Sequence, residues 1–137
     1  MVTQGKKIRV LLGKSDQDAH DRGIRYIAGV LRDAAMEVIF IRYRVWNEVV
    51  QVALQEDADI IGMSFYGSGY RYDVPNVIRS LKEHGKEAGI LVGGTIPKGD
   101  WRALREMGVI GIFVPGVPTE EVIKCITSYV KNKGQNS

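Results

Sequence analysis

Cysteine is nearly absent from this sequence, which has Cys125 alone among its 137 residues. One thiol excludes an internal disulfide and a cysteine-ligated metal cluster, and it favours an intracellular, reducing compartment. Long apolar runs are missing too, because no segment approaches the ~20 consecutive apolar residues that a membrane helix needs. The N-terminus also lacks the apolar stretch of a secretory signal. We therefore expect a cytoplasmic protein that does not associate with a membrane.

Charge of one sign is not concentrated in any part of the chain. The 19 basic and 16 acidic side chains give a formal net charge of +3, and the basic residues are spread along the whole length. This distribution gives little support to a nucleic-acid partner, and we expect none. The length and the 45% hydrophobic content suit one domain over residues 1–137. Its core is expected at about 8–131, with polar ends at 1–7 and 131–137 that fray.

Five short apolar runs rich in β-branched residues predict buried strands. They lie at residues 8–12, 38–41, 60–63, 90–92 and 110–114. Between them apolar residues recur at helical spacing, and Pro75 suits the first turn of the third helix. Strict alternation of strands and helices with short connections implies a parallel sheet covered on both faces. The predicted fold is a doubly wound, five-stranded α/β domain, flavodoxin-like or Rossmann-like, with strand order 2-1-3-4-5.

A sheet of this order binds ligands beyond the carboxyl ends of its strands, where the connections of strands one and three diverge. Three unusual segments follow strands at this edge: the polar loop 13–23, the segment 64–70, and the segment 93–97, which begins Gly93-Gly94-Thr95. A phosphoryl receiver would need an aspartate after strand three, where this chain has Ser64, and a lysine after strand five, where it has the turn 114–116. A flavodoxin-type phosphate loop is disfavoured, because Asp16, Asp18 and Asp21 would repel phosphate.

The polar loop resembles the signature of a known family. Asp18-Ala19-His20-Asp21-Arg22-Gly23 fits the D-x-H-x-x-G motif of cobalamin-binding domains. Ser64 and then Gly93-Gly94 follow in the order and spacing of the same family. The similarity covers about residues 8–130, and it points to the domain found in methylmalonyl-CoA mutase and related acyl-CoA mutases.

The resemblance implies a corrinoid bound base-off, with the cobalt ligated from below by His20. Neutral imidazole is a good ligand for cobalt, and its second nitrogen needs a fixed acceptor that sets tautomer and basicity. Asp18 resembles the acceptor of the family, and Lys14 matches a lysine found near that pair. Together, Asp18 and Lys14 would tune how strongly His20 donates to the metal.

The resemblance also implies a deep crevice for the displaced dimethylbenzimidazole tail. Ser64 would hydrogen-bond the base, Gly93 and Gly94 would leave room for the tail, and Gly23 would permit a close approach of the first helix. Thr95 is a further candidate for a tail contact. The full set of implied cofactor-binding residues is Lys14, Asp18, His20, Asp21, Arg22, Gly23, Ser64, Tyr66, Gly93, Gly94 and Thr95, with His20 as the metal ligand.

Three positions depart from the family pattern. The usual leucine two residues after the serine is Tyr66, which either stacks on or hydrogen-bonds the base, or else narrows the crevice. The usual glycine between the aspartate and the histidine is Ala19. Methylmalonyl-CoA mutases carry a histidine where this chain has Tyr70, a difference that bears on the identity of the substrate.

The function implied by the resemblance is that of the small subunit of an adenosylcobalamin-dependent acyl-CoA mutase, an isomerase that rearranges a carbon skeleton by radical chemistry. The chain would be inactive alone and would need a large barrel subunit that binds the acyl-CoA, with a heterotetramer as the family-like assembly. The alternatives are a free-standing cobalamin carrier, chaperone or sensor, and a corrinoid protein for methyl transfer. Co-purification with a barrel subunit would separate them.

Overall fold

The computed structural model describes residues 7–135 and contains a five-stranded sheet. Its strands are β1 (Arg9–Ser15), β2 (Glu37–Tyr43), β3 (Ile60–Phe65), β4 (Gly89–Gly94) and β5 (Val109–Phe113). All neighbouring strands are parallel, in the order β2-β1-β3-β4-β5. The predicted doubly wound topology with strand order 2-1-3-4-5 is therefore confirmed.

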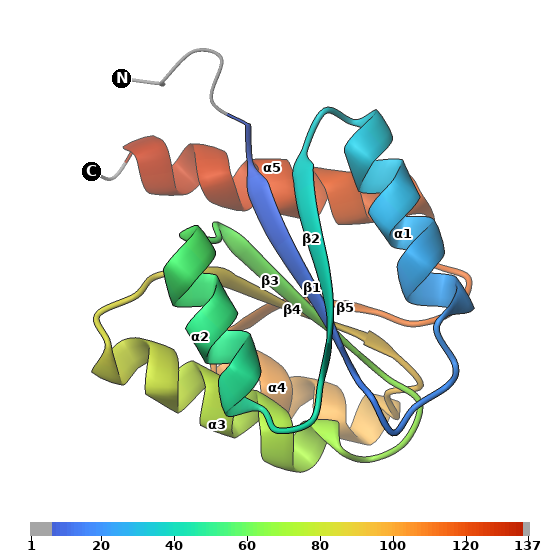
Figure 1. The fold of residues 1–137 in the computed structure, drawn as a ribbon. Coiled ribbons are helices and arrows are strands. Elements are labelled where there is room, and N and C mark those ends of the chain that lie inside the picture. Colours follow the sequence, from blue (N-terminus) through green and yellow to red (C-terminus); the bar gives the residue numbers. More distant parts are fainter. Residues whose placement is uncertain (1–6, 136–137) are drawn as a thin grey trace.

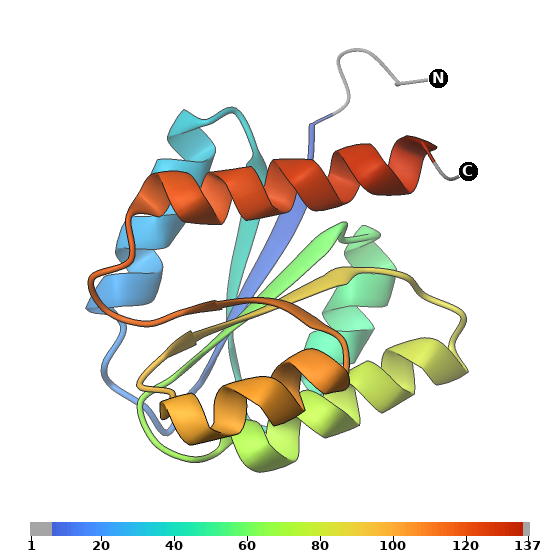
Figure 2. The same cartoon turned by 180° about the vertical axis from the view of Figure 1, so that it is seen from behind.

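Helices cover both faces of the sheet. They are α1 (Arg22–Asp33), α2 (Asn47–Glu56), α3 (Tyr70–Glu83), α4 (Trp101–Glu106), which follows the short turn η1 (Lys98–Asp100), and α5 (Thr119–Gln135). Figures 1 and 2 show α1 and α5 on one face and α2, α3 and α4 on the other. Within residues 7–135, no helix has both the length and the apolar character needed to cross a membrane.

Each face of the sheet has its own hydrophobic core, because side chains alternate along every strand. In β1, Leu11 is buried in the core beneath α2, α3 and α4. Its neighbours Val10 and Leu12 are buried in the second core, beneath α1 and α5. Burial on both faces explains why the strands appear in the sequence as nearly continuous apolar runs.

The observed elements extend beyond the predicted ranges. Strand β1 continues through Lys14 to Ser15, because these residues pair with β2, and the polar loop therefore starts after Ser15. The prediction that Pro75 lies in the first turn of its helix is wrong, since α3 starts at Tyr70. Proline lacks an amide hydrogen, so this helix lacks the backbone bond from residue 75 to residue 71.

The C-terminal helix also runs further than the sequence suggested. Helix α5 extends to Gln135, so the fraying predicted for 131–135 is wrong. The Lys133 ammonium group donates to the carbonyl oxygen of Glu87 at 3.1 Å and ties this last part of α5 to the segment before β4. The fraying predicted for residues 1–6 and 136–137 lies outside the described residues.

Candidate functional site

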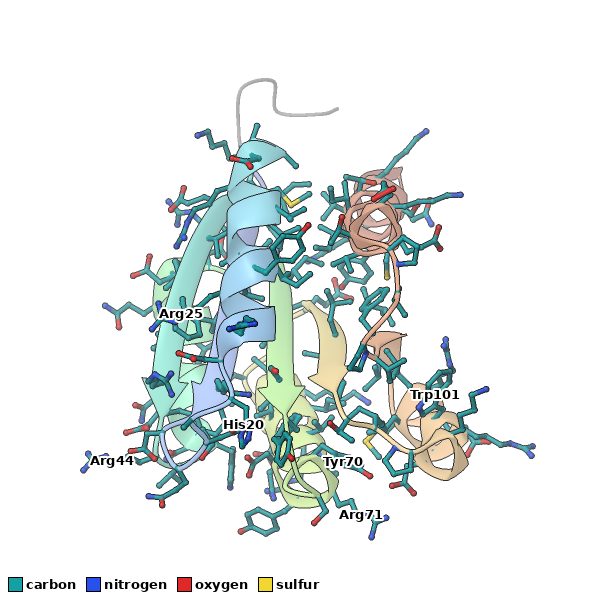
Figure 3. The ribbon with its side chains drawn as sticks, turned by 90° about the vertical axis from the view of Figure 1, so that its right-hand side faces the viewer. His20, Arg25, Arg44, Tyr70, Arg71 and Trp101 are labelled. Atoms are coloured by element: carbon teal, nitrogen blue, oxygen red, sulfur yellow. The ribbon has the colours of Figure 1, made fainter. Side chains whose placement is uncertain are left out.

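The loop between β1 and α1 places His20 at the carboxyl edge of the sheet. Figure 3 shows His20 at the end toward which the strand arrows point. Backbone bonds fix the start of the loop, from Asp16 N to Tyr43 O at 2.8 Å and from Asp18 N to Ser15 O at 3.1 Å. The Asp18 carboxylate then accepts from the backbone N–H of His20 at 2.8 Å. Aspartate forms this kind of local turn readily, and the turn fixes the position of the His20 backbone.

The His20 ring is held on one edge and open on the other. Its Nδ1 lies 2.9 Å from Oδ1 of Asp18, while 59% of the side chain is exposed. The ring stacks on Tyr66, with centroids 3.7 Å apart and an interplanar angle of 1°. Because Asp18 engages Nδ1 and sets the tautomer, Nε2 is the nitrogen left to bind a metal.

Asp18 connects His20 to the interior of the domain. Its second oxygen accepts from the Lys14 ammonium at 3.0 Å and from the backbone N–H of Tyr66 at 3.2 Å. Lys14 is 1% exposed and also lies 3.4 Å from the Ser64 hydroxyl. Burial alone would favour the neutral acid, but the hydrogen bonds from His20 and Lys14 and the Lys14 charge lower the pKa of Asp18 to about 2.

The lowered pKa of Asp18 predicts a specific acid sensitivity. Because the folded value of about 2 is below the ordinary 3.8, ionised Asp18 stabilises the fold above pH 4, and that contribution is lost as the pH falls through about 2. We expect wild type to exceed Asp18→Asn in unfolding free energy by on the order of 2 kcal/mol at pH 7. Urea unfolding at several pH values measures the difference, which should shrink between pH 4 and pH 2. A difference independent of pH would contradict this role for the carboxylate.

A cavity of about 360 Å³ opens beside this network, between α1 and α5 and over the carboxyl ends of the strands. Most of its lining is apolar. From the strands and the turn that follows β5 come Leu12, Gly62, Met63, Ser64, Leu91, Val92, Gly93, Gly94, Phe113, Val114, Pro115, Gly116 and Val117. The flanking helices contribute Gly23, Ile24, Tyr26, Ile27, Thr119 and Val122. The cavity therefore suits an apolar group.

Ser64 is the residue shared by the cavity and the buried network. It lines the cavity and pairs with Lys14 across β1 and β3. Since the Ser64 oxygen accepts from the Lys14 ammonium, its own O–H is left to donate to a polar atom in the cavity.

The three predicted glycines have different structural roles. Gly93 lines the cavity, and a Cβ there would make an ordinary contact with Phe113 O at 3.4 Å. Gly94 has φ +106°, and a Cβ there would lie 1.9 Å from the carbonyl oxygen of Phe65. Gly23 lines the cavity, but its Cβ would meet nothing within 4 Å. The expectation that Gly23 permits a close helix approach is therefore wrong, because there is free space at that position.

The remaining predicted residues lie outside the cavity lining. Tyr66 and Thr95 are exposed, and the alternative in which Tyr66 narrows the crevice is wrong because its ring lies on His20 instead. Arg22 is exposed at the start of α1. The Asp21 carboxylate accepts from Arg25 at 2.7 Å and also from Arg42. The Arg25 hydrogen bond, together with both positive charges, holds the pKa of Asp21 below its ordinary value.

Sequence reasoning missed two parts of this region. Arg42, in β2, was not among the predicted site residues, yet it bonds the loop that carries His20. The turn 114–117 was considered only as the end of strand five, although it forms one wall of the cavity. The predicted strand order could have indicated both features. It places the end of β2 next to β1, and the end of β5 next to β4.

Comparison with known proteins decides the family. Residues 8–124 match the B12 binding domain. The chain belongs to the B12-binding domain family. The predicted resemblance is therefore confirmed, and the ligand of the family is cobalamin.

Two small subunits of mutases are similar to this B12-binding domain over most of their length. The 2-hydroxyisobutanoyl-CoA mutase small subunit of Aquincola tertiaricarbonis is 39% identical, over 93% of this chain and 95% of that protein. The pivalyl-CoA mutase small subunit of Xanthobacter autotrophicus is 38% identical, over 90% and 84%. The solved structure of a cobalamin-binding protein from Desulfitobacterium hafniense shares the fold, with a TM-score of 0.75 and 16% identity, over 90% of this chain and 60% of that chain.

The site of this B12-binding domain fits a corrinoid at both ends. An exposed imidazole whose Nδ1 is held by Asp18 presents Nε2 as a donor to a metal. The nearby apolar cavity, with the Ser64 hydroxyl in its lining, suits an aromatic base that has a polar nitrogen. Lys14, buried between Asp18 and Ser64, connects the two parts.

Proposed function

We propose that the chain is the cobalamin-binding small subunit of an adenosylcobalamin-dependent acyl-CoA mutase, acting as one domain that binds the cofactor base-off. The continuous set of contacts from His20 through Asp18 and Lys14 to Ser64 supports this proposal best. It connects the His20 imidazole, which can bind a metal, to an apolar cavity that suits the base of the cofactor. The similarity to two small subunits of mutases over nearly their whole length supports the assignment to an isomerase.

In this proposal each residue has a separate task. His20 would bind the cobalt through Nε2, and the Asp18 carboxylate fixes the ring by accepting a hydrogen bond from Nδ1–H. Lys14 supplies the positive charge that pairs with the Asp18 carboxylate and helps to lower its pKa. Ser64 donates to the base, and the apolar walls of the cavity exclude water from it. When bound, adenosylcobalamin supplies the radical that starts a carbon-skeleton rearrangement.

The proposal includes a large partner subunit that binds the acyl-CoA in a barrel and covers the other face of the cofactor. The names of the two relatives support a partner of this kind, because each is called the small subunit of a mutase. Two large and two small subunits in the cytoplasm form the proposed assembly. The small subunit alone is then inactive, since its own residues bind and orient the cofactor but hold no substrate.

An absorption titration with adenosylcobalamin tests the metal ligand. We expect wild type to give a base-off, histidine-on spectrum and His20→Ala to lose it, because no other imidazole lies in the loop. The control is His84→Ala, since Nδ1 of His84 bonds the carbonyl oxygen of Ser80 at the end of α3. Identical spectra for wild type and His20→Ala would overturn the ligand assignment.

The same titration separates the proposed function from the alternatives when a candidate large subunit is added. Mutase activity that requires both subunits supports the proposal. A histidine-on spectrum without any activity or complex in the presence of barrel subunits would favour a free-standing carrier, chaperone or sensor.

A further inference from the structure

Arg42 contacts the metal-ligand loop on both sides of His20. One guanidinium nitrogen donates to the backbone carbonyl of Asp18 at 3.0 Å. The other donates to the carboxylate of Asp21. These two acceptors are the residues two before and one after His20, so a single side chain from β2 spans the segment that carries the imidazole.

The Arg42 guanidinium is itself held in place. Arg42 pairs with Lys14 across β1 and β2, so its backbone position is set by the sheet and not by the loop. The Phe40 ring lies 6.0 Å from the Arg42 guanidinium carbon and 5.4 Å from that of Arg25. Arg25 shares the Asp21 carboxylate, at 2.7 Å. Arg42 and Phe40 from β2 and Arg25 from α1 therefore form one cluster next to the loop.

We propose that Arg42 is a positioning residue that holds the His20 loop in the shape needed for metal ligation. Asp18 orients the imidazole ring, and its carboxylate ties that residue to Lys14 of β1, whereas Arg42 attaches the loop to β2 through the Asp18 carbonyl and the Asp21 carboxylate. Arg42 lies on a strand, so its two hydrogen bonds connect the loop to a rigid element. The inference rests on the proposed function, because it assigns Arg42 a task in binding through His20.

The chemistry of arginine suits this task better than that of lysine. A planar guanidinium donates in two fixed directions, so it can engage a carbonyl and a carboxylate together, whereas an ammonium is a single point charge. The side chain is 34% exposed, and ion pairs at exposed sites contribute little to stability. We therefore expect the main effect of Arg42 to be on the geometry of ligation and not on the fold.

Four variants test the proposal by titration of the full chain with adenosylcobalamin. Arg42→Gln removes the guanidinium, and Arg42→Lys keeps the charge but not the paired donors. Arg25→Gln removes a bond to Asp21 only. The matched control is Arg44→Gln, which removes the same charge from a 79% exposed side chain two residues along. Circular dichroism melts accompany each titration, so that all spectra are recorded on folded protein.

We expect Arg42→Gln to bind adenosylcobalamin base-off through the cavity but with most of the histidine-on signal lost, and with an apparent Kd raised about tenfold. Arg42→Lys should resemble Arg42→Gln, while Arg44→Gln should match wild type and Arg25→Gln should lie close to it. If the charge alone mattered, Arg42→Lys would match wild type and the proposal would be wrong.

Two outcomes distinguish this inference from the proposed function. If wild type itself shows no histidine-on spectrum, the proposed function fails, and the role of Arg42 fails with it. If wild type shows the spectrum and Arg42→Gln retains it in full, only the role of Arg42 is overturned. Should Arg42→Gln melt below the working temperature, Asp21→Ala removes one of the same two contacts from the loop side and is expected to reduce the same signal.

Discussion

Gly94→Ala is expected to destabilise the fold by roughly 4 kcal/mol, because the added methyl group brings both backbone strain and a steric clash. The backbone at Gly94 has φ +106°, a region that side chains disfavour. An added Cβ would also lie 1.9 Å from the carbonyl oxygen of Phe65, a backbone atom that is held in β3 and cannot turn aside. The melting temperature, measured by circular dichroism, should fall by roughly 10 °C or more.

The adjacent glycine provides the control. At Gly93 a Cβ would make its nearest contact at 3.4 Å, with Phe113 O, which is ordinary van der Waals distance. Gly93→Ala is therefore expected to change the unfolding free energy by less than about 1 kcal/mol. Equal stability of the two variants would show that the backbone at Gly94 adapts and does not require glycine.

Lys14→Met is expected to cost about 3 kcal/mol of unfolding free energy. The Lys14 ammonium is buried and pairs with the Asp18 carboxylate, which is itself only 16% exposed. Methionine fills a similar volume, so the loss is that of the charge partner and not of packing. The pKa of Asp18 should rise toward its ordinary value, because a cation that lowers it is gone. Urea unfolding at pH 7 measures the energy.

The double variant Lys14→Met with Asp18→Asn separates loss of the pair from loss of one partner. Removing both charges leaves no buried anion without its cation, so the double variant should be less destabilised than the sum of the two single variants. Strict additivity would mean that the two side chains do not interact, contrary to their 3.0 Å separation.

The sheet was predictable because its strands are buried on both faces. Residues such as Leu11 and Ile61 lie within stretches of consecutive apolar residues, and that pattern is typical of a strand within a parallel sheet. The strand order then placed the segments after β1, β3 and β4 at one edge. The site motif was equally local, since Asp18 and His20 are two residues apart and the turn between them is formed by the aspartate itself.

Features that depend on contacts between residues far apart in the chain could not be predicted from the sequence. Lys14 looks like a loop residue, and only its pairing with both β2 and β3 shows that it is a buried strand residue. The stacking of Tyr66 on His20 joins two loops that are far apart in the chain. The contacts of Arg42 require the register between β1 and β2, which the pattern of apolar residues does not fix to a single position.

The pairing of Lys14 with Ser64 has a consequence for affinity. Under the proposed function the cofactor is a bivalent ligand, with cobalt at one end, a base at the other and a covalent chain between them. Binding of the first end raises the effective concentration of the second, by an amount that depends on how well the chain matches the span between the two sites. Lys14 and Ser64 are paired neighbours on β1 and β3, and Asp18 links His20 to Lys14, so the sheet limits how far the two sites can separate. The domain should therefore tolerate changes at either end of a corrinoid better than changes in the length of the chain that joins them.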